Sequence, residues 1–218
     1  MRTVIQDLPD IVLASESPWR REMFGWLGLK FRTAVSGFPE EEVKWDEFDD
    51  PHAFVRAIST GKAMSASIEE PESIVITADS SVFLNEKNYG KPQNLDEARV
   101  FLQEQSGQLP VVVTAVSVYD PSTRELAVES IESSVRLMSL TPETIERLIA
   151  SGEPLGKAGG FDILGEIRPY IEEIEGSPSS IIGLPLLTIK EMLEDLGISI
   201  DVDIRTSIFQ KTGYVEPV

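Results

Sequence analysis

The sequence contains no cysteine among its 218 residues and only one histidine, His52. Disulfides, thiolate nucleophiles and thiolate metal sites are therefore excluded. His52 falls in the first turn of a predicted helix, where a solvated or capping role explains it, so histidine triads and histidine metal sites are set aside as well. Any catalytic chemistry must depend on carboxylates, basic side chains and backbone groups.

Long apolar runs are also missing. No uninterrupted hydrophobic stretch approaches the roughly 20 residues of a membrane-spanning helix. The first ten residues, MRTVIQDLPD, lack the apolar region and cleavage site of a signal peptide. Together with the absence of cysteine, which fits a reducing compartment, these features predict a cytoplasmic protein with no membrane partner.

Basic residues are scarce, since 19 lysines and arginines stand against 37 acids and leave a formal net charge of −18. Such a chain repels extended polyanions, so a nucleic acid polymer is not an expected partner. A few bases that converge on one cleft can still bind a small anion such as a triphosphate. Acidic runs such as Glu40–Glu42 are interpreted as solvated surface that keeps the protein soluble.

The remaining composition is that of an ordinary globular protein, with 41% hydrophobic and 26% charged residues. A chain of this length can bury a core without disulfides or a structural metal. We expect a single domain over residues 1–198. Residues 199–218 are expected to form a C-terminal extension, a strand or tail outside the main domain.

Hydrophobic periodicity alternates between strand and helix, which indicates an α/β fold. Strands are predicted at residues 11–14, 30–35, 74–78, 111–119 and 126–138, the last two as a hairpin. Asp79 is expected at the carboxyl end of the third of these strands, or inside a longer strand that runs to Leu84. Helices are predicted to begin near residues 18, 51, 95, 141 and 185. A turn is expected at residues 85–89, and a glycine-rich loop near the cleft at residues 156–165.

The segment from Ser15 to Arg21 is a candidate anion site because it joins a buried strand to a helix. Ser17 suits the N-cap and Pro18 the first helical position. Hydroxyls, unpaired backbone N–H groups and two guanidiniums then gather at a helix N-terminus, where anions bind well. An ordinary capped amphipathic helix with exposed arginines explains the same residues, so both interpretations stay open.

Further short motifs follow this segment along the chain. They are Lys62-Ala63, Thr77-Ala78-Asp79-Ser80, Gly90-Lys91-Pro92, Ser106-Gly107, Ser151-Gly152-Glu153-Pro154, Lys157-Ala158-Gly159 and Gly183-Leu184-Pro185-Leu186. Together with Ser15-Glu16-Ser17-Pro18-Trp19-Arg20, this ordered set resembles the Maf family over residues 10 to 197. Chance agreement of so many blocks in one order is remote.

The resemblance implies a fold and a reaction. The fold is α/β, like that of the house-cleaning inosine triphosphate pyrophosphatases, with an elongated mixed sheet flanked by helices and two lobes around a cleft. The reaction is hydrolysis of a nucleoside triphosphate between its α and β phosphates, which gives the monophosphate and pyrophosphate. The implied cofactor is a divalent metal, Mg or Mn, and a homodimer is the implied assembly.

The resemblance also assigns roles by position. Phosphate binding is implied for Ser15, Ser17 and Arg20. Cations of the catalytic cleft are implied at Lys62 and Lys91. The central catalytic carboxylate is Asp79, and Glu40 assists it with the metal or the water. These roles agree with elementary electrostatics, since three cations and a divalent ion roughly balance the four or so negative charges of a triphosphate. A turn-forming aspartate is the alternative interpretation of Asp79.

Three residues depart from the common family pattern. Ser80 stands where threonine is common, a change that keeps the hydroxyl and should matter little. Trp19 stands where many members carry arginine, and the branch with tryptophan there is associated with N7-methylguanosine triphosphate. The ring can stack on a base, or it can pack in the core with Met23. Leu164 stands where the family usually has glutamine or glutamate and cannot hydrogen-bond a base, which leaves Asp162 or Glu166 as candidates for that task. We expect a preference for a purine or modified triphosphate over thymidine triphosphate.

A second functional class remains open at this point. A non-catalytic nucleotide-binding or cell-division regulatory protein would keep the phosphate cradle but turn over no standard nucleotide. The lysines, arginine and aspartate of the motifs favour the enzyme. An acidic α/β domain of unrelated function is the third interpretation, and the ordered motifs leave it little room.

Overall fold

The computed structural model describes residues 10–217, so the start of the domain expected at residues 1–198 and most of the segment tested for a signal peptide lie outside the described residues. One mixed sheet of seven strands runs through the molecule in the order β2-β1-β3-β5-β6-β7, with β4 paired to β3. The strands are β1 (Ile11–Ala14), β2 (Arg32–Ala34), β3 (Ile74–Leu84), β4 (Lys87–Tyr89), β5 (Val111–Asp120), β6 (Glu125–Leu137) and β7 (Ile171–Glu175). Strand β1 pairs in parallel with β2 and β3, and the other pairs are antiparallel.

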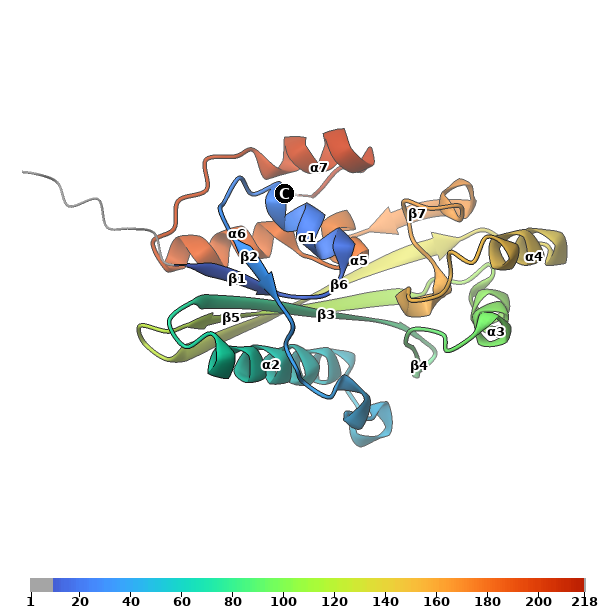
Figure 1. The fold of residues 1–218 in the computed structure, drawn as a ribbon. Coiled ribbons are helices and arrows are strands. Elements are labelled where there is room, and N and C mark those ends of the chain that lie inside the picture. Colours follow the sequence, from blue (N-terminus) through green and yellow to red (C-terminus); the bar gives the residue numbers. More distant parts are fainter. Residues whose placement is uncertain (1–9, 218) are drawn as a thin grey trace, which may run out of the picture.

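Helices cover both faces of this sheet (Figure 1). Helix α2 (Pro51–Glu69) packs on one face, against β3 and β5. The opposite face carries α1 (Pro18–Gly25), α6 (Leu186–Asp195) and α7 (Ile204–Thr212), and α5 (Pro178–Ile182) precedes α6. Helices α3 (Leu95–Gln105) and α4 (Pro142–Ala150) lie together at one end. The expected α/β fold is confirmed. Within residues 10–217, no helix combines the length and apolar character needed to cross a bilayer.

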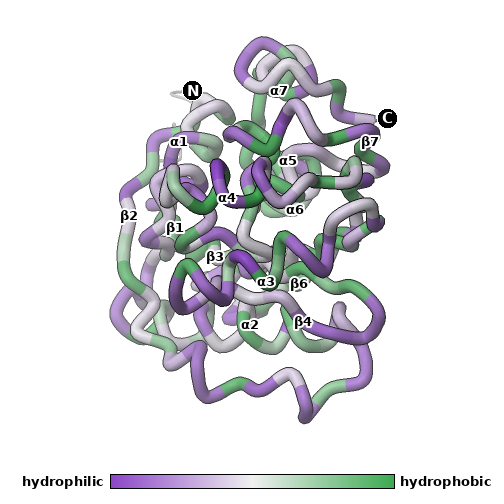
Figure 2. Tube along the Cα trace, turned by 90° about the vertical axis from the view of Figure 1, so that its right-hand side faces the viewer, coloured by the Kyte–Doolittle hydropathy of each residue, from purple (hydrophilic) through white to green (hydrophobic). Residues whose placement is uncertain are grey.

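The buried side chains form two main clusters that correspond to the expected lobes. The first cluster joins β1, α1, α6 and α7, and the second joins α3, α4 and residues 161–167. Strand β3 belongs to both, since Ile76 lies in the first cluster and Val82 in the second. Figure 2 colours the trace by hydropathy, and hydrophobic and hydrophilic residues alternate along most of its elements. A long strand that crosses both lobes therefore positions any site between them.

Capping residues fix where the two helices nearest the cleft begin. The Ser17 side chain accepts a hydrogen bond from the Arg20 backbone N–H at 3.3 Å, and Pro18 is the first residue of α1. Asp50 accepts the backbone N–H groups of the first turn of α2. Both predicted starts are confirmed, and each satisfies donors that a helix end leaves without partners.

The C-terminal region differs from the expectation. Residues 204–212 form helix α7, not a strand or tail, and Ile204 and Ile208 are buried in the first cluster. The boundary of the main domain at residue 198 stays a prediction, but the expectation of a strand or tail was wrong for this segment. Its apolar residues are few, but two of them four residues apart are enough to bury one face of a short helix. Strand β4 also lies within the predicted turn, and β7 and α5 were not predicted.

Candidate active site

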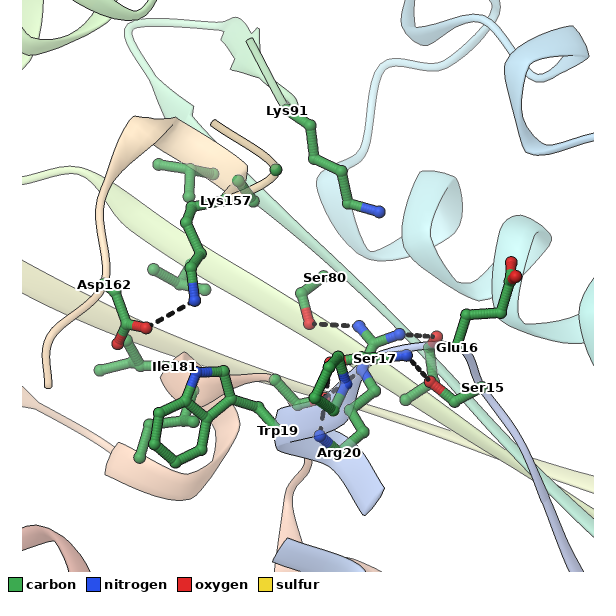
Figure 3. A pocket seen from close by; sticks show the side chains of 18 of the residues that line it. Ser15, Glu16, Ser17, Trp19, Arg20, Ser80, Lys91, Lys157, Asp162 and Ile181 are labelled. Carbon is green, nitrogen blue, oxygen red and sulfur yellow. Dashed lines mark hydrogen bonds and ion pairs between the residues drawn. The ribbon is translucent and has the colours of Figure 1, made fainter. Parts of the chain in front are cut away.

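A pocket of about 530 Å³ lies between the two lobes, where β1 ends and α1 begins. Its walls come from the Ser15–Arg20 turn, from β3, from the loop at residues 156–163 and from the α5–α6 turn (Figure 3). Seven of the eight predicted site residues line it: Ser15, Ser17, Trp19, Arg20, Glu40, Lys62 and Lys91. The eighth, Asp79, lies just behind Lys62.

Sheet register explains why the pocket opens here. Strand β1 is short, and its last partner along β3 is Ile76, which pairs with Leu13. The next residues of β3 therefore run beside the turn that starts α1. Arg20 occupies the place beside β3 that β1 no longer reaches, and its Nη1 donates a hydrogen bond to the Ala78 carbonyl at 2.7 Å. A side chain of α1 thus takes the place of a sheet neighbour.

Arg20 also reaches two other elements. Its Nε donates to the Gly183 carbonyl at 2.8 Å, and its Nη2 donates to Ser80 Oγ at 3.1 Å. Burial lowers the pKa of the Arg20 guanidinium, while the nearby Asp79 and Glu40 carboxylates act in the opposite direction. An arginine in this setting stays charged. Arg20 therefore joins α1, β3 and the α5–α6 turn, in addition to placing a cation in the pocket.

Lys62 is the second organising cation. It projects from α2, is only 5% exposed, and its Nζ lies 2.8 Å from Asp79 Oδ1 and 2.9 Å from Glu40 Oε2. A buried ammonium needs such partners, because an unpaired buried charge is strongly destabilising. Asp79, 8% exposed in the middle of β3, is held rigidly by the strand. The structure therefore unites three of the predicted residues, which come from a loop, a helix and a strand.

The donor set fits a divalent metal that also binds substrate. Within the described part of the chain, no cluster of three or more histidine or carboxylate side chains could hold an ion. Magnesium is commonly held by one or two carboxylates together with substrate phosphates, which matches Asp79 and Glu40. In or beside the pocket, the cations Arg20, Lys62, Lys91 and Lys157 face the carboxylates Glu16, Glu40, Asp79 and Asp162. Four cations thus stand against four carboxylates, so the site as a whole has no excess of positive charge.

Trp19 lies in the pocket and not in the core. Met23, one turn further along α1, is fully buried, whereas the Trp19 ring is half-buried and faces the loop at residues 156–163 (Figure 3). Lys157 Nζ lies 5.9 Å from the centroid of that ring and 2.7 Å from Asp162 Oδ2. The interpretation of Trp19 as a core residue was wrong. The position of Lys157 was not predicted, although the Lys157-Ala158-Gly159 motif was the available signal.

Another departure, Leu164, packs against the second cluster and does not line the pocket. Of its two candidate substitutes, Glu166 is exposed and lies outside the pocket, whereas Asp162 lines it. Asp162 Oδ1 accepts the Leu164 backbone N–H at 3.0 Å, which fixes the carboxylate. Of the two candidate carboxylates, only Asp162 therefore lies in the pocket.

The fold and the pocket together define a class of α/β protein with a cleft between two lobes, in which a buried lysine links a pair of carboxylates. More specifically, the chain belongs to the Maf family, because the family model described as Maf-like protein matches residues 10–196.

Relatives of similar length support this assignment. A dTTP/UTP pyrophosphatase of Deinococcus radiodurans is 36% identical over 191 residues, which cover 88% of this chain and 95% of the relative. A dTTP/UTP pyrophosphatase of Pelotomaculum thermopropionicum is 33% identical, with 88% and 100% covered. A nucleoside triphosphate pyrophosphatase of a Synechococcus species is 34% identical, with 88% and 97% covered. The solved structure of the Staphylococcus aureus Ham1 protein aligns with a TM-score of 0.41 at 17% identity, over 59% of this chain and 71% of that chain.

Proposed function

We propose that this Maf family protein hydrolyses a nucleoside triphosphate between the α and β phosphates and releases the monophosphate and pyrophosphate, with Mg or Mn as cofactor. The observation that carries the proposal is Lys62, which links the Asp79 and Glu40 carboxylates at the edge of a pocket that contains both cations and carboxylates. The names of the relatives, dTTP/UTP pyrophosphatase and nucleoside triphosphate pyrophosphatase, support the same activity.

The phosphates occupy the end of the pocket at the start of α1 in this proposal. Ser15 and Ser17 present hydroxyls there, beside the N–H groups of the first turn. Arg20 and Lys91 supply charge from two sides, and Lys91 points into the pocket (Figure 3).

Asp79 and Glu40 are the residues that would hold a divalent ion and orient the attacking water. In this proposal they act at the phosphate end of the pocket, and the wall formed by Trp19, Lys157 and Asp162 is the base-side wall. A bound Mg or Mn ion supplies Lewis-acid stabilisation of the phosphoryl oxygens. Lys62 keeps the two carboxylates together and adds one positive charge against the triphosphate.

A pyrophosphate-release assay tests the activity. The purified protein is incubated with a nucleoside triphosphate panel in the presence of Mg, Mn or a chelator, and pyrophosphate and monophosphate are quantified. With metal, we expect equal amounts of the two products. With chelator, the rate should be at least roughly 100-fold lower, because the ion lowers the activation free energy by several kcal/mol when it stabilises the charge that develops in the transition state. Nucleotide binding without pyrophosphate from any nucleotide would instead favour the non-catalytic regulatory protein.

The base-side wall favours a purine with a guanine-type edge in this proposal. Trp19 offers a stacking face, and beside it lie an ammonium donor on Lys157 and a carboxylate acceptor on Asp162. The edge of guanine presents one hydrogen-bond acceptor followed by two donors. The acceptor matches the Lys157 ammonium, and the two donors match the two oxygens of the Asp162 carboxylate. Thymine and uracil place an acceptor where the second donor would be. This preference differs from that printed in the names of the two dTTP/UTP relatives.

Replacement of Trp19 by arginine is therefore expected to change the nucleotide profile. Stacking contributes on the order of 1–3 kcal/mol per base, so Trp19→Arg should lower kcat/KM for guanosine and N7-methylguanosine triphosphates by about tenfold. The values for uridine and thymidine triphosphates should fall less, so the ratio between the two groups measures the effect. A wild type that prefers thymidine triphosphate, with a ratio unmoved by Trp19→Arg, would contradict the base assignment.

Three broader properties remain predictions. They are a cytoplasmic location, a homodimeric state, and the absence of nucleic acid polymers and membranes among the partners. The net charge of −18 supports the exclusion of polyanions. The absence of cysteine supports a reducing compartment.

A further inference from the structure

The last residues of the described chain return toward the pocket after α7. We name this segment, Gly213–Pro217, the C-terminal strap. Gly213 adopts a left-handed conformation with φ 75°, and a Cβ atom there would lie 2.9 Å from Arg168 Nη2. Glycine thus permits the reversal that ends α7. The strap then lies next to β7 and α5 (Figure 2). The strap lies beyond residue 196, where the family match ends.

Glu216 is the most deeply buried part of the strap, at 3% exposure. Its carboxylate accepts hydrogen bonds from Ser177 Oγ, from Ser179 Oγ at 2.8 Å and from the Ser179 backbone N–H at 3.1 Å. It therefore holds the first turn of α5. The far end of this five-residue helix forms the pocket wall, where the Gly183 carbonyl accepts Arg20 Nε.

Tyr214 connects the strap to the opposite wall. Its hydroxyl donates to the Ile163 carbonyl at 3.1 Å, and the Arg168 guanidinium lies 4.7 Å from its ring centroid. Burial raises the pKa of Tyr214, which keeps the hydroxyl available as a donor. Ile163 directly follows Asp162, the carboxylate assigned to the base edge. One short segment thus holds the neighbours of both Arg20 and Asp162.

We infer that the C-terminal strap sets the geometry of the nucleotide pocket, with Glu216 and Tyr214 as positioning residues for its two walls. The inference rests on the proposed function, because the pocket is taken to bind nucleotide. Loss of a buried acceptor leaves its donors unsatisfied, so the first turn of α5 loosens without Glu216. Nucleotide binds only when both walls are in place. The apparent dissociation constant therefore rises as the fraction of molecules with both walls in place becomes smaller.

Two conservative variants and one control test this inference through the split between KM and kcat. Glu216→Gln preserves volume but turns an amide toward the serine donors, and Tyr214→Phe removes only the hydroxyl. We expect KM to rise about tenfold in Glu216→Gln and about threefold in Tyr214→Phe, with kcat within about twofold of wild type, because the closed walls still support turnover. Val215→Ala is the control, since Val215 lies between the two residues and is 74% exposed.

A purely structural role would reduce the active fraction, so kcat would fall at unchanged KM. That pattern, or a KM within about twofold of wild type in both variants, would overturn the inference. Tyr214→Phe decides the matter if Glu216→Gln does not fold.

Amide hydrogen exchange tests the role of the strap without relying on catalytic activity. In nucleotide-free protein, we expect faster amide exchange in Glu216→Gln than in wild type over residues 177–183, and in Tyr214→Phe over residues 161–164, with α2 unchanged as an internal reference. If wild type hydrolyses no nucleotide but the exchange accelerates, the proposed function fails and the strap stands. If wild type is active and neither exchange nor KM moves, the strap fails.

Discussion

Asp79→Asn is expected to lower kcat by about 10²–10³-fold while the protein stays folded. The change is nearly isosteric, but it removes the negative charge that holds a divalent ion or orients water. Lys62 keeps Glu40 as an ion-pair partner at 2.9 Å, so the buried ammonium is not left unpaired. KM should change far less than kcat, because the phosphate-binding cations are untouched.

Steady-state pyrophosphate release measures this effect, with circular dichroism as the check on folding. Asp195→Asn is the matched control, since it makes the same chemical change at an exposed residue at the end of α6. Activity of Asp79→Asn within a few-fold of wild type would show that Asp79 is not the central carboxylate.

Arg20→Ala is expected to impair both activity and stability. It removes the donor to three acceptors, the carbonyls of Ala78 and Gly183 and the hydroxyl of Ser80. Unsatisfied acceptors in a partly buried site typically cost 1–3 kcal/mol each, and water will solvate some of them, so we expect a loss of about 2–4 kcal/mol in the free energy of unfolding. Loss of a cation and of the wall geometry should lower kcat/KM by about 100-fold or more.

Arg21→Ala provides the control for charge, because Arg21 is the next residue of α1 and is exposed. Arg20→Lys separates charge from geometry: an ammonium cannot donate to the three acceptors as a planar guanidinium does, so it should recover little activity. Denaturant unfolding and kcat/KM are measured on all three variants. Full activity and stability in Arg20→Lys would show that Arg20 acts only as a charge.

The elements that position the site were largely predictable from local sequence. Ser17-Pro18 and Asp50-Pro51 carry their own helix-start signals, and the apolar, β-branched residues from Ile74 onward mark the start of the central strand. These signals depend on groups only a few residues apart in the sequence. They therefore favour a helix start or a strand independently of the tertiary structure. The weaker patterns of β7, α5 and α7 were missed, because such short elements are stabilised by packing more than by propensity.

The sequence by itself determined the residue types available for chemistry, the family resemblance and seven side chains that line one pocket. Tertiary structure alone decided how they meet. Trp19 and Met23 share a helical face, yet α1 begins beyond the end of β1, so the first turn faces the pocket and the next faces the core. The link from Asp79 through Lys62 to Glu40, and the strap on α5, join segments far apart in the chain. Only sheet register and the packing of distant helices bring such groups within hydrogen-bond distance, and no local pattern encodes either.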